Sequence, residues 1–155
     1  MSSSTDNFLI TGLPRSRTAW FSAYLTQGDV LCTHEAVAHK LPMTSENHRY
    51  VGTADSGYIL DPDWMEEYEG IKIVIIERDT QECIDSLNKL IPADCTWLLN
   101  SMAKALKKVD ALRVPFYDIA DNLEAIHDYL GLPGYSQERA VLFSILNIQA
   151  QEWRS

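Results

Sequence analysis

A short apolar run, a turn and a helix-like pattern follow one another over residues 8–21 of the chain. The apolar run ends at Gly12 and Pro14, and aromatic residues then recur at helical spacing. A strand, a tight loop and a helix in this order form an anion cradle in α/β proteins, because backbone N–H groups and the positive end of the helix dipole converge there. The predicted anion loop also carries two arginines and two hydroxyl residues, Arg15, Ser16, Arg17 and Thr18.

This loop lacks the residues with which a Walker-type loop binds a magnesium nucleoside triphosphate. Aligned from Gly12 with the pattern G-x-x-x-x-G-K-[ST], the chain has Arg17 in place of the second glycine. Thr18 takes the place of the lysine, and Ala19 takes the place of the hydroxyl residue that holds Mg²⁺. Magnesium-dependent hydrolysis of ATP or GTP is therefore disfavoured.

The loop instead resembles the 5′-phosphosulfate loop of sulfotransferases that use 3′-phosphoadenosine 5′-phosphosulfate (PAPS), whose usual form is P-K/R-S-G-T-T-W. Residues 14–20 read Pro-Arg-Ser-Arg-Thr-Ala-Trp and match that form at Pro, Arg, Ser, Thr and Trp. They depart from it at Arg17, where the family has Gly, and at Ala19, where it often has Thr. The alternative interpretation is a charged turn ahead of an amphipathic helix.

A second strand-to-helix turn follows the β-branched run of residues 71–76, which is typical of a central parallel strand buried on both faces. Asp79 and Glu82 form an Asp-first capping box that starts a helix, so Arg78 lies in the turn. Ser86 lies about two helical turns further, roughly 10 Å along the axis. Taken alone, these residues indicate no more than a turn arginine paired with an acidic neighbour. Together with the first loop, they resemble the family's 3′-phosphate site, R-D-P-x-D-x-x-x-S, in which the Arg and the Ser bind the 3′-phosphate.

His34 and Glu35 follow a predicted strand at residues 30–33, at the edge where open α/β sheets bind ligands. Sulfuryl transfer needs a base for the acceptor's proton, and either residue can act as one. The resemblance favours Glu35, because tyrosylprotein-type enzymes use a Glu about twenty residues after the basic residue of the loop, and Thr33-His34-Glu35 resembles their G-E-E stretch. Cytosolic members use a His, so His34 is the second candidate. Both could equally be solvated strand-end residues.

The remaining patterns predict a three-layer α/β P-loop-type fold with a mostly parallel central sheet flanked by helices. It would form one domain over residues 1–155, with a flexible leader over residues 1–6. His39 and His48 are predicted to be surface residues. The other predicted strands are 7–11, 50–53 and 113–117, and the predicted helices are 18–27, 61–68, 95–111, 122–130 and 137–151. Residues 114–133 also resemble the family pattern "v-x-Y-E-D-L … i-x-x-F-L-G-l-P".

Composition limits the classes of partner. The net charge of −9 and the pI near 4.8 argue against broad binding to nucleic acid or to an anionic membrane. The three cysteines lack metal-ligand spacing and cannot all pair, which is typical of a reducing compartment. Residues 1–7 are polar, unlike a secretory signal, and no apolar run reaches transmembrane length. We therefore expect a cytoplasmic protein.

With the resemblance, the sequence predicts a short, minimal PAPS-dependent sulfotransferase of the tyrosylprotein or bacterial type. It would transfer a sulfuryl group, without a metal, to a hydroxyl or amine of a small-molecule or peptide acceptor and release adenosine 3′,5′-bisphosphate (PAP). The resemblance implies that Arg78 and Ser86 bind the 3′-phosphate and that Arg15 stabilises the charge on the departing PAP. It further implies that Trp20 lies near the adenine and that the loop holds the 5′-phosphosulfate. The predicted cofactor-binding residues at the loop are therefore Arg15, Ser16, Arg17, Thr18, Ala19 and Trp20.

Some features leave alternatives open. Trp20 could be a core aromatic of its helix. The chain is shorter than typical family members and lacks their R-K-G-x-x-G-D-W-K segment, for which Trp153 and Arg154 do not substitute. A small P-loop kinase that uses ATP is one alternative function. A non-catalytic nucleotide-binding module on a degenerate sulfotransferase scaffold is the other.

Overall fold

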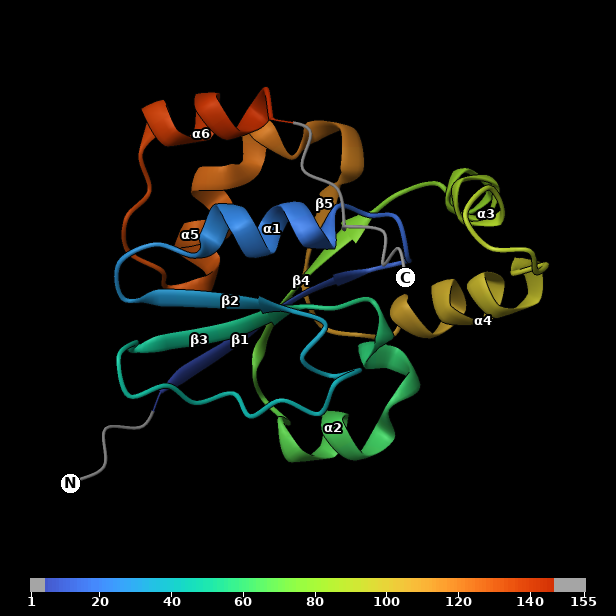
Figure 1. Cartoon of the computed structure of the whole chain (residues 1–155), viewed down its shortest axis with the longest axis horizontal. Helices are drawn as coiled ribbons and strands as arrows, with labels where there is room; N and C mark the ends of the chain where they lie inside the picture. Colours follow the sequence, from blue (N-terminus) through green and yellow to red (C-terminus); the bar gives the residue numbers. More distant parts are fainter. Residues whose placement is uncertain (1–4, 147–155) are drawn as a thin grey trace.

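Five strands form one parallel sheet in the order β2-β3-β1-β4-β5, as the computed structural model shows for the residues that it describes, 5–146 (Figure 1). The strands are β1 (Asp6–Gly12), β2 (Val30–His34), β3 (Tyr50–Ala54), β4 (Lys72–Glu77) and β5 (Leu112–Pro115). The α-helices are α1 (Thr18–Leu25), α2 (Pro62–Glu67), α3 (Thr80–Asn88), α4 (Thr96–Leu106), α5 (Leu123–Leu130) and α6 (Gln137–Ser144). Three short 3₁₀ helices are η1 (Gly57–Leu60), η2 (Phe116–Asp118) and η3 (Ala120–Asn122).

Helices cover both faces of the sheet, which confirms the predicted α/β class. Successive side chains of a strand point to opposite faces, so Phe8 and Ile10 of β1 pack in one core with α1, α5 and α6. Leu9 packs in a second core with α2, α3 and α4. The unbroken apolar run of β4 follows from this arrangement, because both of its faces are buried.

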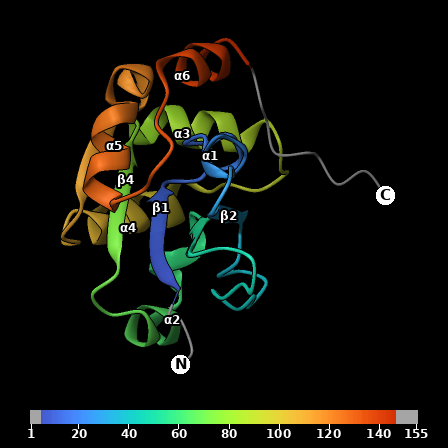
Figure 2. The ribbon, with the colours of Figure 1, turned by 90° about the vertical axis from the view of Figure 1, so that its left-hand side faces the viewer.

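The strand order brings two segments that are distant in sequence to one edge. Figure 2 shows β4 beside β1, and in their register Gly12 lies opposite Ile76. The loop after β1 and the turn after β4 therefore leave the sheet next to each other. On the other side of β1, Ala54 of β3 lies opposite both Ile10 and His34. The carboxyl ends of four neighbouring strands thus meet at one edge, where open α/β sheets bind ligands.

The largest differences between predicted and observed helix bounds are at two helices. The helix predicted over residues 95–111 ends at Leu106, where the guanidinium of Arg113 donates to the carbonyl oxygens of Leu106 and Val109, at 2.8 Å each. Those carbonyls therefore have a side-chain partner and the chain turns into β5. The last helix is described as far as Ser144, and residues 147–151 of its predicted range lie outside the described residues.

The predicted leader is only partly described. Residues 1–4 lie outside the described part of the chain, whereas Asp6 already begins β1. The hydroxyl of Thr5 donates to the carbonyl oxygen of Met43 at 3.2 Å, so the last two residues of the predicted leader, 5 and 6, already contact the rest of the fold. Across residues 5–146, no helix has the length and apolar character needed to cross a membrane.

Candidate functional site

The loop between β1 and α1 carries two residues in the left-handed backbone conformation. Arg15 has φ 76° and Arg17 has φ 65°, and a non-glycine residue there costs roughly 1–2 kcal/mol. Arg17 is also the N-cap of α1, and no side chain caps the first turn of that helix. The first N–H groups of a helix have no intrahelical partner, so this turn can donate to an anion.

The left-handed conformation at Arg17 occurs at a position where the chain differs from the sulfotransferase loop that it resembles. Glycine adopts a positive φ without steric cost, and the family's usual loop has Gly at this position. The chain keeps a conformation that favours glycine and adds a long cationic side chain to it.

The two predicted phosphate-binding segments contact each other directly. Nη1 of Arg78, after β4, donates to the carbonyl oxygen of Arg15 at 2.6 Å. Nε of Arg15 donates to Oγ of Ser86, in α3, at 3.0 Å. Asp79 accepts a hydrogen bond from the backbone N–H of Glu82 at 3.1 Å, which confirms the predicted start of α3. The structure therefore brings Arg15, Arg78 and Ser86 together, while their roles remain predictions.

Phe116 and Tyr117 also belong to this edge, and sequence reasoning missed them. Cζ of Arg78 lies 4.2 Å from the centroid of the Phe116 ring, and Cζ of Arg17 lies 5.3 Å from the same centroid. The hydroxyl of Tyr117 donates to Oε1 of Glu82 at 2.5 Å, and Oε2 of Glu82 lies 3.9 Å from Nε of Arg78. No sequence signal set them apart, because the strand predicted over residues 113–117 included both, whereas β5 ends at Pro115 and the two residues begin η2.

The residues present fit an anionic ligand. Nε of Arg78 is buried and has no hydrogen-bond acceptor among the described residues. A buried donor without a partner costs about 1–3 kcal/mol, and more when it is charged. A phosphate oxygen is the kind of acceptor that a guanidinium binds most strongly.

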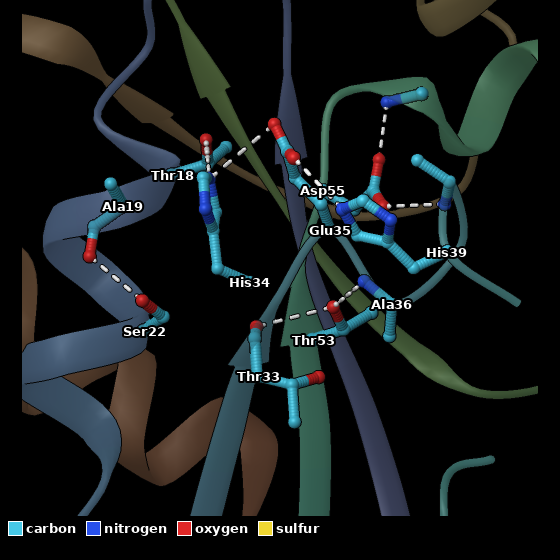
Figure 3. Close-up of polar contacts among 12 residues, drawn as sticks. Thr18, Ala19, Ser22, Thr33, His34, Glu35, Ala36, His39, Thr53 and Asp55 are labelled. Carbon is cyan, nitrogen blue, oxygen red and sulfur yellow. Dashed lines mark hydrogen bonds and ion pairs between the residues drawn. The ribbon is translucent and has the colours of Figure 1, made fainter. Parts of the chain in front are cut away.

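His34 and Glu35 lie beside the start of α1, as Figure 3 shows. Nε2 of His34 lies 3.3 Å from Oγ1 of Thr18 and 3.9 Å from Oε1 of Glu35. On the other side of the Glu35 carboxylate, Oε2 lies 3.5 Å from Nε2 of His39. His39 was predicted only as a surface residue; its side chain is 58% exposed, but it contacts Glu35. These contacts connect the candidate bases to the anion loop through Thr18.

Asp55, which the sequence did not single out, holds the turn that follows Glu35. Its side chain is buried at the end of β3, and Oδ2 accepts the backbone N–H groups of Val37 at 3.0 Å and Ala38 at 3.2 Å. Oδ1 accepts the N–H of Gly57 at 2.5 Å. Burial raises the pKa of Asp55 above its usual value, and the three amides oppose that shift only in part. Asp55 is therefore a positioning residue for the loop that carries Glu35 and His39.

Trp20 has a structural role in place of the predicted contact with adenine. Its side chain is 1% exposed, and its ring stacks on Tyr24 with centroids 5.0 Å apart. Its indole N–H donates to the carbonyl oxygen of Phe143 at 2.9 Å. The prediction that Trp20 stacks on adenine is wrong for this structure, because α1 turns this residue into the core beneath α6. The alternative, a core aromatic, is what the structure shows.

The side chains of Ser16 and Ala19 offer no accessible polar group to a ligand either. Ser16 is fully buried, and its Oγ lies 3.9 Å from Sγ of Cys83. Ala19 accepts a hydrogen bond from Ser22 through its carbonyl oxygen, at 2.8 Å, and has no polar side chain to offer. The backbone of these residues, rather than a Ser16 hydroxyl, is what the loop can present to an anion.

Two surface hollows lie away from the anion loop. One of about 590 Å³ is at the opposite edge of the sheet, where Asn7, Tyr50 and Lys72 line it. The other, of about 480 Å³, lies between residues 40–44 and α2. At the loop itself, Arg15 of the first predicted phosphate-binding segment is hydrogen-bonded to Ser86 of the second.

Comparison with known proteins gives a match in structure and none in sequence. No family model matches the chain, and no curated protein matches it. Among solved structures, mouse sulfotransferase SULT7A1 complexed with PAP is similar over 90% of this chain, with a TM-score of 0.56 and 14% sequence identity. The fold is sulfotransferase-like. The chain covers 64% of the length of that enzyme, and at this identity the likeness shows the fold alone.

Proposed function

We propose that this protein binds PAPS and PAP at the edge formed by residues 15–19, Arg78 and Ser86, and that it transfers the sulfuryl group of PAPS to a hydroxyl or amine acceptor. The observation that carries the proposal is the contact between the two anion-binding segments, Nη1 of Arg78 to the carbonyl oxygen of Arg15 at 2.6 Å. The likeness in fold to a sulfotransferase complexed with PAP supports this class of ligand.

Each segment has the chemistry for one end of such a nucleotide. The uncapped first turn of α1 and the guanidinium of Arg15 would hold the 5′ group. Arg78, whose Nε has no hydrogen-bond acceptor among the described residues, and Ser86 would hold the 3′-phosphate. PAPS supplies an activated sulfuryl group on a nucleotide that can depart as PAP. Arg15 would stabilise the negative charge that develops on the departing oxygen.

The acceptor's proton would go to His34 or Glu35 as the new S–O or S–N bond forms. His34 lies closer to the loop, with Nε2 3.3 Å from Oγ1 of Thr18, and Glu35 lies beyond it. The resemblance in sequence favours Glu35, whereas this geometry equally suits His34 as the base with Glu35 orienting its ring. Separate variants of the two residues distinguish these assignments.

Calorimetry with PAP, AMP and ATP tests the ligand class. We expect PAP to bind at least ten times more tightly than AMP, because AMP lacks the 3′-phosphate, and we expect Arg78→Ala to remove that preference. Arg49→Ala is the matched control, since Arg49 is exposed and pairs with Asp6 at the opposite edge. Equal affinity for PAP and AMP would refute the proposal. A preference for ATP with Mg²⁺, followed by phosphoryl transfer, would indicate the P-loop kinase instead.

Transfer from radiolabelled PAPS to a panel of phenols, alcohols and amines tests the reaction. We expect Glu35→Gln and His34→Ala to reduce turnover while both keep PAP affinity, with the larger loss marking the base. The second candidate function, a non-catalytic nucleotide-binding module, is favoured by the departures from the sulfotransferase loop at Arg17 and Ala19. Retained PAP binding with no turnover on any acceptor would support that module.

A further inference from the structure

The side chain of Arg17 reaches across the end of a neighbouring strand. Arg17 lies in the loop after β1, yet its Cζ is 5.3 Å from the ring centroid of Phe116, which follows β5. Because β4 lies between β1 and β5 in the sheet, the side chain of Arg17 extends over the end of β4. This is where Arg78 leaves the sheet, so the side chain of Arg17 lies near the proposed 3′-phosphate site, called the 3′ seat below, which Arg78 and Ser86 form.

Two guanidinium groups share the ring of Phe116. Cζ of Arg78 lies 4.2 Å from the centroid and Cζ of Arg17 lies 5.3 Å from it, so the two carbon atoms are no more than about 10 Å apart. One phosphate with charge-assisted hydrogen bonds of about 2.8 Å to each guanidinium spans most of that separation. The exposed side chain of Arg17 can close the remaining gap by rotation.

The local charges show what Arg17 adds. Oε2 of Glu82 lies 3.9 Å from Nε of Arg78, so these two charges cancel at the seat. Within residues 5–146 Arg17 has no carboxylate at ion-pair distance, so its positive charge adds to that of Arg15, which is hydrogen-bonded to Ser86. A terminal phosphate monoester carries a charge of about −1.5 to −2 at pH 7, more than a diester or a sulfate ester.

We infer that Arg17 is a specificity-determining residue that binds, together with Arg78, the 3′-phosphate of the nucleotide, and so selects adenosine 3′,5′-bisphosphates over nucleotides with a single 5′ group. The inference rests on the proposed function. In this arrangement the backbone of Arg17 is part of the loop that binds the 5′ group, and its side chain contacts the 3′-phosphate.

The left-handed backbone at position 17 supplies matched variants. Asparagine and glycine tolerate φ 65° better than arginine does, so Arg17→Asn and Arg17→Gly remove the charge without a new backbone strain. Arg17→Lys keeps the charge and loses the planar guanidinium. We expect the melting temperatures of the first two variants to equal or exceed that of the wild type, so that any change in affinity is not caused by unfolding.

Calorimetry with PAP and AMP at two salt concentrations is the test. We expect Arg17→Asn to weaken PAP binding about tenfold, equivalent to about 1.4 kcal/mol, and to change AMP binding less than twofold. Arg17→Lys should lie between the wild type and Arg17→Asn. The affinity of the wild type for PAP should also fall more steeply with salt than that of Arg17→Asn, since one fewer charge pair is screened.

Three results would overturn the inference, and they differ in what else they refute. If the wild type prefers PAP to AMP and Arg17→Asn keeps that preference, the inference fails and the proposed function stands. If Arg17→Asn weakens PAP and AMP equally, the guanidinium serves the 5′ group instead. If the wild type itself shows no preference for PAP over AMP, the proposed function and the inference fail together.

Discussion

Replacement of Asp55 by alanine is expected to destabilise the protein by about 3 kcal/mol. The substitution removes the acceptor for three backbone N–H groups. The N–H of Val37 belongs to a buried residue, and an unpaired buried donor costs about 1–3 kcal/mol. The N–H groups of Ala38 and Gly57 lie in more exposed residues, where water can replace part of each bond, and each adds about 1 kcal/mol or less. Loss of a desolvated carboxylate offsets part of this total.

Urea denaturation and thermal melting measure the effect. A loss of about 3 kcal/mol lowers the melting temperature of a chain of this length by roughly 6–12 °C. Asp121→Ala is the matched control, because Asp121 is exposed and such changes usually stay within about 0.5 kcal/mol. Since Asp55 holds the turn after Glu35, the proposed function predicts that Asp55→Ala also reduces sulfuryl transfer more than it reduces PAP affinity. An unfolding free energy within 1 kcal/mol of the wild type would refute the reasoning, as it would mean that Val37 finds another acceptor.

Further substitutions test the core that Phe8 and Ile10 form with α1, α5 and α6. Burial lowers the pKa of His127 below 6.5, so near that pH the unfolded chain binds a proton that the folded chain does not. The free energy of unfolding should therefore fall as the pH decreases below 6.5, by at most about 1.4 kcal/mol per pH unit. His127→Asn should remove this slope in pH-dependent melts. Gly52→Ala places a methyl group against the ring of Phe8 on the neighbouring strand and should cost about 1–3 kcal/mol in urea denaturation; an unchanged midpoint would contradict the observed register. Trp20→Phe should lower the free energy of unfolding by about 2–4 kcal/mol, because it removes a hydrogen bond and weakens the stacking on Tyr24. PAP affinity measured by calorimetry should change less than twofold. A large loss of affinity would indicate that Trp20 contacts the nucleotide after all.

Local patterns were sufficient for most of the elements. The strand-loop-helix order of residues 8–21 and the capped turn at Asp79 both appear in the structure, because propensity and capping depend on residues close in sequence. The end of α4 could not be predicted in this way. It depends on Arg113, which reaches back from the next strand to the carbonyl oxygens of Leu106 and Val109.

The candidate site likewise contains residues that motif spacing could predict and residues that it could not. The positions of Arg15, Arg78 and Ser86 could be inferred from motif spacing, and the structure brings these three residues together. Asp55 and Phe116 were missed, because an aspartate or a phenylalanine after a strand has no distinctive pattern until its partners are known. Trp20 was assigned to the wrong environment for a related reason: a helix pattern shows which residues share a face, but not whether that face meets a ligand or a core.

The sequence alone therefore determined that the chain has two strand-to-helix turns with the residue types that bind anions, since charge, capping and backbone preference reside in neighbouring residues. Only the tertiary structure decided that β4 pairs with β1, that the side chain of Arg17 extends toward Phe116, and that Glu35 lies between two histidines. Strand pairing and side-chain burial join residues that are tens of positions apart, and their free energy depends on the whole arrangement and on no single segment.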